Sequence, residues 1–121
     1  MFAFALWDRE THSLSLARDR YGQKPLYYAL LPGGIAFGSE LSALRAHPDF
    51  VADIDPDALA MYLRFGNVPA PHAIFRKTHK LVAGTTLTID TKALESGQIA
   101  PLQPYWSAEQ IARDGLATPF A

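Results

Sequence analysis

The sequence contains no cysteine among its 121 residues. That absence excludes disulfide bonds, thiolate zinc sites and a cysteine nucleophile within the chain. Long apolar runs are missing too, since none approaches the roughly 18 residues that a membrane-spanning helix needs. The opening residues, MFAFALWDRE, have no basic segment ahead of the apolar ones, which argues against a secretory signal. We therefore expect a cytoplasmic protein that does not cross a membrane.

Neither sign of charge is in excess: 11 lysines and arginines balance 12 aspartates and glutamates, for a net charge of −1. A chain this balanced has no basic stripe of the kind that nucleic-acid binding requires. Apolar residues make up 49% of the composition, which argues against disorder. The length suits one small domain with its own core. We expect a globular domain that does not bind nucleic acid.

Alternating apolar residues predict antiparallel strands in the first forty residues. Residues 1–8, MFAFALWD, are apolar on both faces, as in a strand that is covered on two sides. A second strand is expected around Leu14 and Leu16, which alternate with serines, and further strands at residues 26–31 and 35–39. The PGG sequence between the last two permits a tight reversal. These strands are expected to form one antiparallel meander.

Helix signals follow the strands. Ser39 is expected to cap a short helix with the sequence ELSALRAH. A second helix has stronger boundaries, with Asp55 at the N-cap, Pro56 at the first helical position and Gly66 after the last turn. We expect that residues 84–90 resume strand character. We also expect that Gly115 ends a short helix and that a linker begins at Pro119. Four aromatic residues are expected to pack in the core: Tyr62, Phe65, Tyr105 and Trp106.

The segment at residues 18–28, RDRYGQKPLYY, has two interpretations. In the first it is a structural turn. Gly22 lets the chain reverse, and the Asp19 carboxylate accepts backbone N–H groups across the reversal, as aspartates commonly do in turns. Arg18 or Arg20 then pairs with Asp19 or with a neighbouring loop.

In the second interpretation, Arg18, Arg20 and Lys24 bind a phosphate or a carboxylate. A phosphate cradle usually needs several glycines that open a helix, whereas here one glycine precedes a strand. The pattern favours the structural turn.

Other polar residues form no recognisable catalytic or metal-binding pattern. Ser39 follows a glycine, but the second glycine that a nucleophile elbow needs is missing. Three aspartates near residue 55 suit a helix N-terminus better than a calcium loop. The histidines lack the spacing of metal ligands on a helix and are expected to be solvated or capping residues: His12, His47, His72 and His79. We predict no catalytic, cofactor-binding or metal-binding residue in this chain.

Four motifs in order resemble the glutamine-hydrolysing asparagine synthetases of the bacterial type: MFAFALWD, LARDRYGQKPLYY, FGSELSALRAHP and DIDPDALAMYLRFGNVPAP. The resemblance extends from about Phe2 to Trp106. The KLVAG sequence at residues 80–84 departs from the family's usual lysine-leucine-proline-proline-glycine. By resemblance, residues 1–103 are the C-terminal part of a type 2 glutamine amidotransferase domain, and residues 104–121 are a linker towards a synthetase domain that the sequence does not include.

The resemblance implies an α+β fold: part of a four-layer αββα sandwich with antiparallel sheets, as in N-terminal-nucleophile hydrolases. In the family, a processed N-terminal cysteine attacks the glutamine side-chain amide and releases ammonia through a thioester. The ammonia reaches a second domain, where ATP has activated aspartate. The nucleophile and the groups that bind glutamine lie upstream of the matched region. No residue of this sequence therefore corresponds to a catalytic residue of the family.

The parent enzyme, by the same resemblance, uses glutamine, aspartate and ATP with Mg, and a homodimer is possible. This chain itself is expected to bind no cofactor. Two alternatives stay open at this point. One is a sister amidotransferase that acts on another acceptor, in polysaccharide or β-lactam biosynthesis. The other is a free-standing scaffold domain without catalytic activity.

Overall fold

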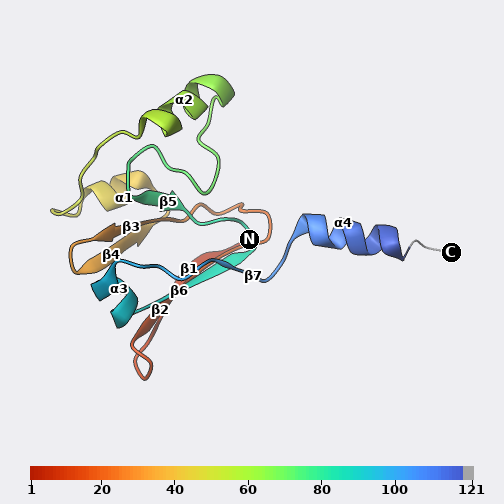
Figure 1. The fold of residues 1–121 in the computed structure, drawn as a ribbon, viewed down its shortest axis with the longest axis horizontal. Coiled ribbons are helices and arrows are strands. Elements are labelled where there is room, and N and C mark those ends of the chain that lie inside the picture. The colour runs from red at the N-terminus through yellow and green to blue at the C-terminus, as the bar shows by residue number, and fades with distance from the viewer. Residues whose placement is uncertain (119–121) are drawn as a thin grey trace.

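The computed structural model describes residues 1–118 (Figure 1). In chain order the elements are β1 (Ala3–Asp8), β2 (Ser13–Arg18), β3 (Tyr27–Leu31), β4 (Gly34–Gly38), α1 (Leu41–Arg45), α2 (Pro56–Phe65), β5 (Thr78–Lys80), β6 (Thr85–Asp90), α3 (Thr91–Ser96), β7 (Gln103–Pro104) and α4 (Ala108–Ala117). None of the helices in this part of the chain is both long enough and apolar enough to cross a membrane.

The strands form two antiparallel sheets. Sheet A has the strand order β1-β2-β6-β7, and sheet B has the order β4-β3-β5. The chain therefore passes from sheet A to sheet B between β2 and β3 and returns at β6 (Figure 1). The expected single meander was wrong, because the second edge of β2 pairs with β6, which is more than sixty residues further along the chain.

One apolar cluster joins the two sheets. On β2 and β6, Leu16 lies opposite Leu87 and Leu14 lies opposite Ile89, so all four side chains share one face of sheet A. Sheet B contributes Tyr28 to the same buried cluster, and the segments that flank it contribute Leu26 and Leu81. The sheets thus pack face to face around a single core.

Helix α1 covers the outer face of sheet B (Figure 1). Its Leu44 is buried, and a side chain added at Gly38 of β4 would meet Ala43 and Leu44. Together, α1, sheet B and sheet A make three successive layers. The expected α+β class with antiparallel sheets is confirmed, and the fourth layer of an αββα sandwich stays a prediction.

The outer face of sheet A is apolar at its β1 edge and exposed to solvent. Phe4 lies opposite Ala17 and Leu6 lies opposite Ser15, so both side chains point away from the core. Phe4 is 50% exposed and Leu6 is 60% exposed. The expectation of a first strand covered on two sides was therefore wrong for residues 1–118. β1 is an edge strand whose outer face lacks a covering layer in this part of the chain.

Local capping signals identified both ends of one helix correctly and misplaced the start of another. The Asp55 carboxylate accepts from the backbone N–H groups of Asp57 and Ala58, and Gly66 ends α2 in the left-handed conformation, as expected. Ser39 does not cap α1: the N-cap is Glu40, whose side chain instead accepts a hydrogen bond from the Ser42 hydroxyl.

The C-terminal helix and the aromatic residues also differ from what the sequence predicted. Helix α4 passes through Gly115 and continues to Ala117, so Gly115 does not end it. The linker expected from Pro119 lies outside the described residues. Tyr62 and Phe65 are more than half exposed on α2 instead of packing in the core, because α2 lies beyond α1, away from both sheets (Figure 1). Tyr105, which was also expected in the core, is 45% exposed.

Candidate functional site

The connection from β2 to β3 contains the RDRYGQKPLYY segment and forms the polar centre of the molecule. β2 ends at Arg18 and β3 begins at Tyr27. Between them, Gly22 adopts a positive φ of 64°, which L-amino acids with side chains rarely adopt. A Cβ atom at this position would lie 2.8 Å from Nη2 of Arg18, so the reversal also needs glycine for space.

The Asp19 side chain organises this turn through its carboxylate. Its oxygens accept backbone N–H groups from four residues, at distances of 3.0 to 3.4 Å: Phe2, Tyr21, Gln23 and Lys24. Asp19 is only 4% exposed. A carboxylate surrounded by backbone donors is stabilised in its charged form. Asp19 therefore holds the turn together in the way that the sequence predicted.

Arg18 uses its guanidinium group in a complementary way. All three of its nitrogens donate to backbone carbonyls: Nε to Lys24 at 2.9 Å, Nη1 to Leu81 at 2.6 Å and Nη2 to Gly22 at 2.7 Å. The side chain is buried, and Leu81 belongs to the segment between β5 and β6. Arg18 therefore ties the turn to a segment that is distant in sequence, and it does not pair with Asp19.

These contacts decide between the two interpretations of the segment. An anion site would need Arg18, Arg20 and Lys24 to converge with unused donors. The guanidinium nitrogens of Arg18 already donate to carbonyl groups, while the side chains of Arg20 and Lys24 are exposed at the surface. The structural turn is confirmed.

The hydrogen bond from the Lys24 backbone N–H is the main cause that lowers the pKa of Asp19 to about 2, from 3.8 in an unfolded chain. Burial opposes this shift, and the backbone N–H groups of Gln23, Phe2 and Tyr21 reinforce it. Between these two values the unfolded chain binds a proton that the folded chain does not. The stability that Asp19 confers is therefore present above 3.8 and lost as the pH falls through about 2.

We expect urea unfolding midpoints to fall as the pH is lowered from 3.8 to about 2, and to fall less steeply in Asp19→Asn, which cannot titrate at this position. The difference between the two proteins isolates Asp19 from the other carboxyl groups. Parallel curves for the two proteins would show that Asp19 makes no pH-dependent contribution to folding.

The histidines have local roles, and two of them meet in a way that the sequence did not reveal. Nδ1 of His47 accepts the backbone N–H of Asp49. His72 and His79 lie opposite one another in an isolated antiparallel bridge, and the His79 ring lies 5.2 Å from that of Tyr28. Desolvation is the main cause that lowers the pKa of His79, and His72 lowers it further. No sequence spacing marks this pair, because the bridge joins a loop to β5.

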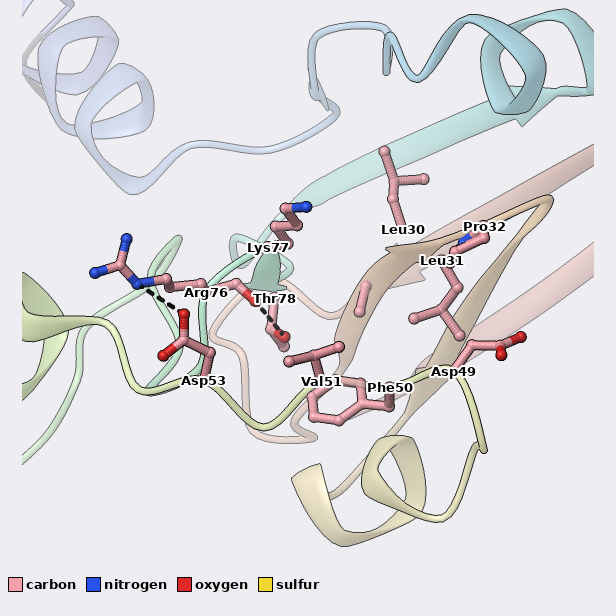
Figure 2. Close-up of a pocket in the computed structure, with 11 residues that line it drawn as sticks. Leu30, Leu31, Pro32, Asp49, Phe50, Val51, Asp53, Arg76, Lys77 and Thr78 are labelled. Atoms are coloured by element: carbon pink, nitrogen blue, oxygen red, sulfur yellow. Dashed lines mark hydrogen bonds and ion pairs between the residues drawn. The ribbon is translucent and has the colours of Figure 1, made fainter.

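A pocket of about 250 Å³ lies at the end of β3, where β5 no longer pairs with it (Figure 2). Leu30 and Leu31 line it together with Phe50 and Val51, so its wall is largely apolar. Arg76 and Asp53 also line the pocket, and they form an exposed ion pair of 3.2 Å. The lining also includes Asp49, Lys77 and Thr78, but the Thr78 hydroxyl donates to the Arg76 carbonyl, so it is paired with a backbone acceptor and not with a general base.

Within residues 1–118 we find no set of side chains that fits the ATP and Mg that the resemblance implies for a parent enzyme. Residues 1–118 contain no cluster of three or more histidine or acidic side chains that could hold a metal ion. The one buried cation in the turn, Arg18, already donates to carbonyl groups. We therefore derive no step that involves ATP or Mg from these residues.

Comparisons with known proteins give the family. The glutamine amidotransferase domain family matches residues 1–106. Asparagine synthetase [glutamine-hydrolyzing] 3 of Bacillus subtilis is 34% identical over 90% of this chain, and asparagine synthetase [glutamine-hydrolyzing] 1 of that species is 37% identical over 74%. A putative asparagine synthetase [glutamine-hydrolyzing] of Mycobacterium bovis is 36% identical over 94%.

The chain spans only 17%, 14% and 18% of the lengths of these three relatives. The family match nevertheless covers both sheets, the Arg18–Asp19 turn and the segment that ends at Trp106. It confirms the resemblance that the ordered sequence motifs indicated. This chain belongs to the glutamine amidotransferase domain family.

Proposed function

We propose that this chain is the structural part of a glutamine amidotransferase domain, in a longer enzyme that hydrolyses glutamine and supplies the ammonia for ATP-dependent amidation of aspartate. The observation that carries the proposal is the family match over residues 1–106, together with relatives of which the chain spans less than a fifth. Their names describe glutamine-hydrolysing asparagine synthetases.

The polar centre of the chain supports a structural role. Catalysis of amide hydrolysis needs a nucleophile, a proton acceptor and donors aimed at a developing oxyanion. In the turn, the Asp19 carboxylate and the Arg18 guanidinium are instead bonded to backbone groups of their own chain. We propose that the nucleophile and the residues that bind glutamine belong to the remainder of the longer enzyme.

The apolar outer face of β1 also supports the proposal that other parts of the longer enzyme complete this domain. Phe4, Leu6 and their neighbour Phe2 are 40 to 60% exposed along one edge of sheet A. Covering ~500 Å² of apolar surface contributes on the order of 10 kcal/mol, which is comparable to the net stability of a whole domain. We propose that the rest of the amidotransferase domain covers this face, with residues 104–121 leading on to the synthetase domain.

The reaction of the longer enzyme is then a nitrogen transfer in two parts. Water and the glutamine side-chain amide give glutamate and ammonia, and the ammonia nitrogen becomes the side-chain amide of asparagine. Within this division of labour, residues 1–106 maintain the sheets on which the glutamine site is built. The acceptor site lies outside this chain.

The proposal predicts where the nitrogen goes. The full reading frame to which the sequence belongs is expressed and supplied with glutamine labelled with ¹⁵N in its side-chain amide, aspartate, ATP and Mg²⁺. We expect asparagine that carries ¹⁵N in its amide, detected by mass spectrometry, and no labelled asparagine in a control without ATP.

Two other results would contradict this proposal at different levels. Glutamate formation without labelled asparagine would leave the amidotransferase intact and disprove aspartate as the acceptor. The absence of both products in a folded full-length protein would disprove the amidotransferase proposal itself.

A further inference from the structure

A two-residue segment before α4 binds across the Arg18–Asp19 turn; we call Tyr105–Trp106 the strap. The backbone N–H groups of Tyr105 and Trp106 both donate to the carbonyl of Gly84, at 2.9 and 3.2 Å. Gly84 has a positive φ of 69°, and a Cβ atom there would lie 2.5 Å from the Trp106 carbonyl oxygen. Because Gly84 has no side chain, the backbone of the strap can approach it to contact distance.

The side chains of the strap contact the turn itself. The Tyr105 hydroxyl donates to the carbonyl of Arg18 at 2.6 Å, and its ring stacks on Phe2 with 6.5 Å between centroids. The Trp106 ring meets Tyr21 edge to face at 5.0 Å. Both aromatic residues therefore contact the region in which backbone N–H groups donate to the Asp19 carboxylate.

Backbone hydrogen bonds connect the turn to the start of β1 and to Gly84. The backbone N–H of Asp19 donates to the Phe2 carbonyl at 2.9 Å, and the Asp19 carbonyl accepts from Gly84 at 3.0 Å. The strap, Gly84, the turn and Phe2 are consequently joined by an unbroken chain of hydrogen bonds.

Helix α4 begins directly after the strap, with Ser107 as its N-cap. The helix extends away from both sheets (Figure 1), and its apolar residues Ile111 and Leu116 are 58% and 82% exposed. Within residues 1–118, α4 is connected to the rest of the fold mainly through the strap. The chain that joins β7 to α4 runs through Tyr105 and Trp106.

We propose that the strap is a conformational coupling device, which docks on Gly84 and the Asp19 turn in one state and is released in another. Docking closes the turn and fixes Phe2 at the start of β1; release loosens both. In the longer enzyme of the proposed function, on which this consequence alone rests, displacement of α4 is thereby transmitted to the amidotransferase domain.

Hydrogen exchange of backbone amides tests the coupling on the chain itself, without any catalytic assay. In Tyr105→Phe the hydroxyl contact to Arg18 is lost while the ring remains. We expect exchange at Gln23 and Lys24, whose amides bind Asp19, to become about fivefold faster, the factor for one net hydrogen bond. Tyr27→Phe is the matched control, because the contact of Tyr27 with the Lys80 ammonium is made by the face of its ring, which the substitution keeps.

A second pair of variants moves the strap without touching Tyr105. Gly84→Ala places a Cβ against the Trp106 carbonyl and should also speed exchange in the turn. Gly33→Ala has a similar positive φ of 73° but open space around it, so it reproduces the backbone strain without the collision. We expect Gly33→Ala to leave exchange in the turn unchanged.

Two outcomes would overturn the proposal. In the first, Tyr105→Phe speeds exchange of the Tyr105 and Trp106 amides while Gln23 and Lys24 keep their protection, so the strap opens without reaching the turn. In the second, all amides, including those of β6, accelerate equally, which means that only global stability has changed. Either outcome leaves the proposed function standing, since neither measurement involves glutamine.

Discussion

Replacing Arg18 with alanine is expected to lower the free energy of unfolding by about 3 kcal/mol, because three backbone carbonyls lose their donors and each net hydrogen bond contributes about 1 kcal/mol. The carbonyls belong to Gly22, Lys24 and Leu81, so the loss loosens the turn and its attachment to the segment before β6. Denaturation in urea, followed by circular dichroism, measures the change.

Two further variants make this result specific. Arg18→Lys keeps the charge but supplies one nitrogen in place of three, and we expect it to lose about 2 kcal/mol. Arg20→Ala removes an exposed arginine from the same turn and should change stability by less than about 0.5 kcal/mol. Equal effects of Arg18→Ala and Arg20→Ala would show that the carbonyl contacts of Arg18 do not hold the fold.

The parts of this fold that local chemistry determines could be predicted from sequence. Asp55, Pro56 and Gly66 mark the two ends of α2 because a cap, a fixed φ and a left-handed residue each act within one helical turn. The role of Asp19 was predictable for the same reason, since three of its four donors lie within five residues. Helix α3 was missed, although Asp90 and Gly97 cap it in the same way.

The sheet assignment could not be predicted from local patterns. Alternating apolar residues identify a strand, but they do not identify its neighbour. β2 pairs with β6 across an interval of more than sixty residues, so the hairpin-like spacing between β2 and β3 was misleading. The exposure of the outer face of β1 could not be predicted, because an apolar strand has the same sequence pattern whether or not the layer that covers it is part of the chain.

The candidate site shows the same division between local and distant contacts. Sequence reasoning identified the turn but left open the partners of Arg18, one of which is the carbonyl of Leu81. The bond from the Tyr105 hydroxyl to Arg18 spans 87 positions. The pairing of His72 with His79 likewise follows from strand arrangement and not from spacing. By contrast, the order of four motifs was sufficient to predict the family, which the match over residues 1–106 confirms.

The most direct test of the account is glutamine turnover by the chain alone, and its predicted effect is the largest of all: complete absence of activity. The chain has no cysteine, and its buried charged residues Arg18 and Asp19 are bound to backbone groups. Purified protein is incubated with glutamine, and glutamate and ammonia are measured against a blank without protein. We expect no turnover above the blank. Glutamine hydrolysis that disappears when a single residue of this chain is substituted would contradict the account, because the catalytic residues would then lie within it.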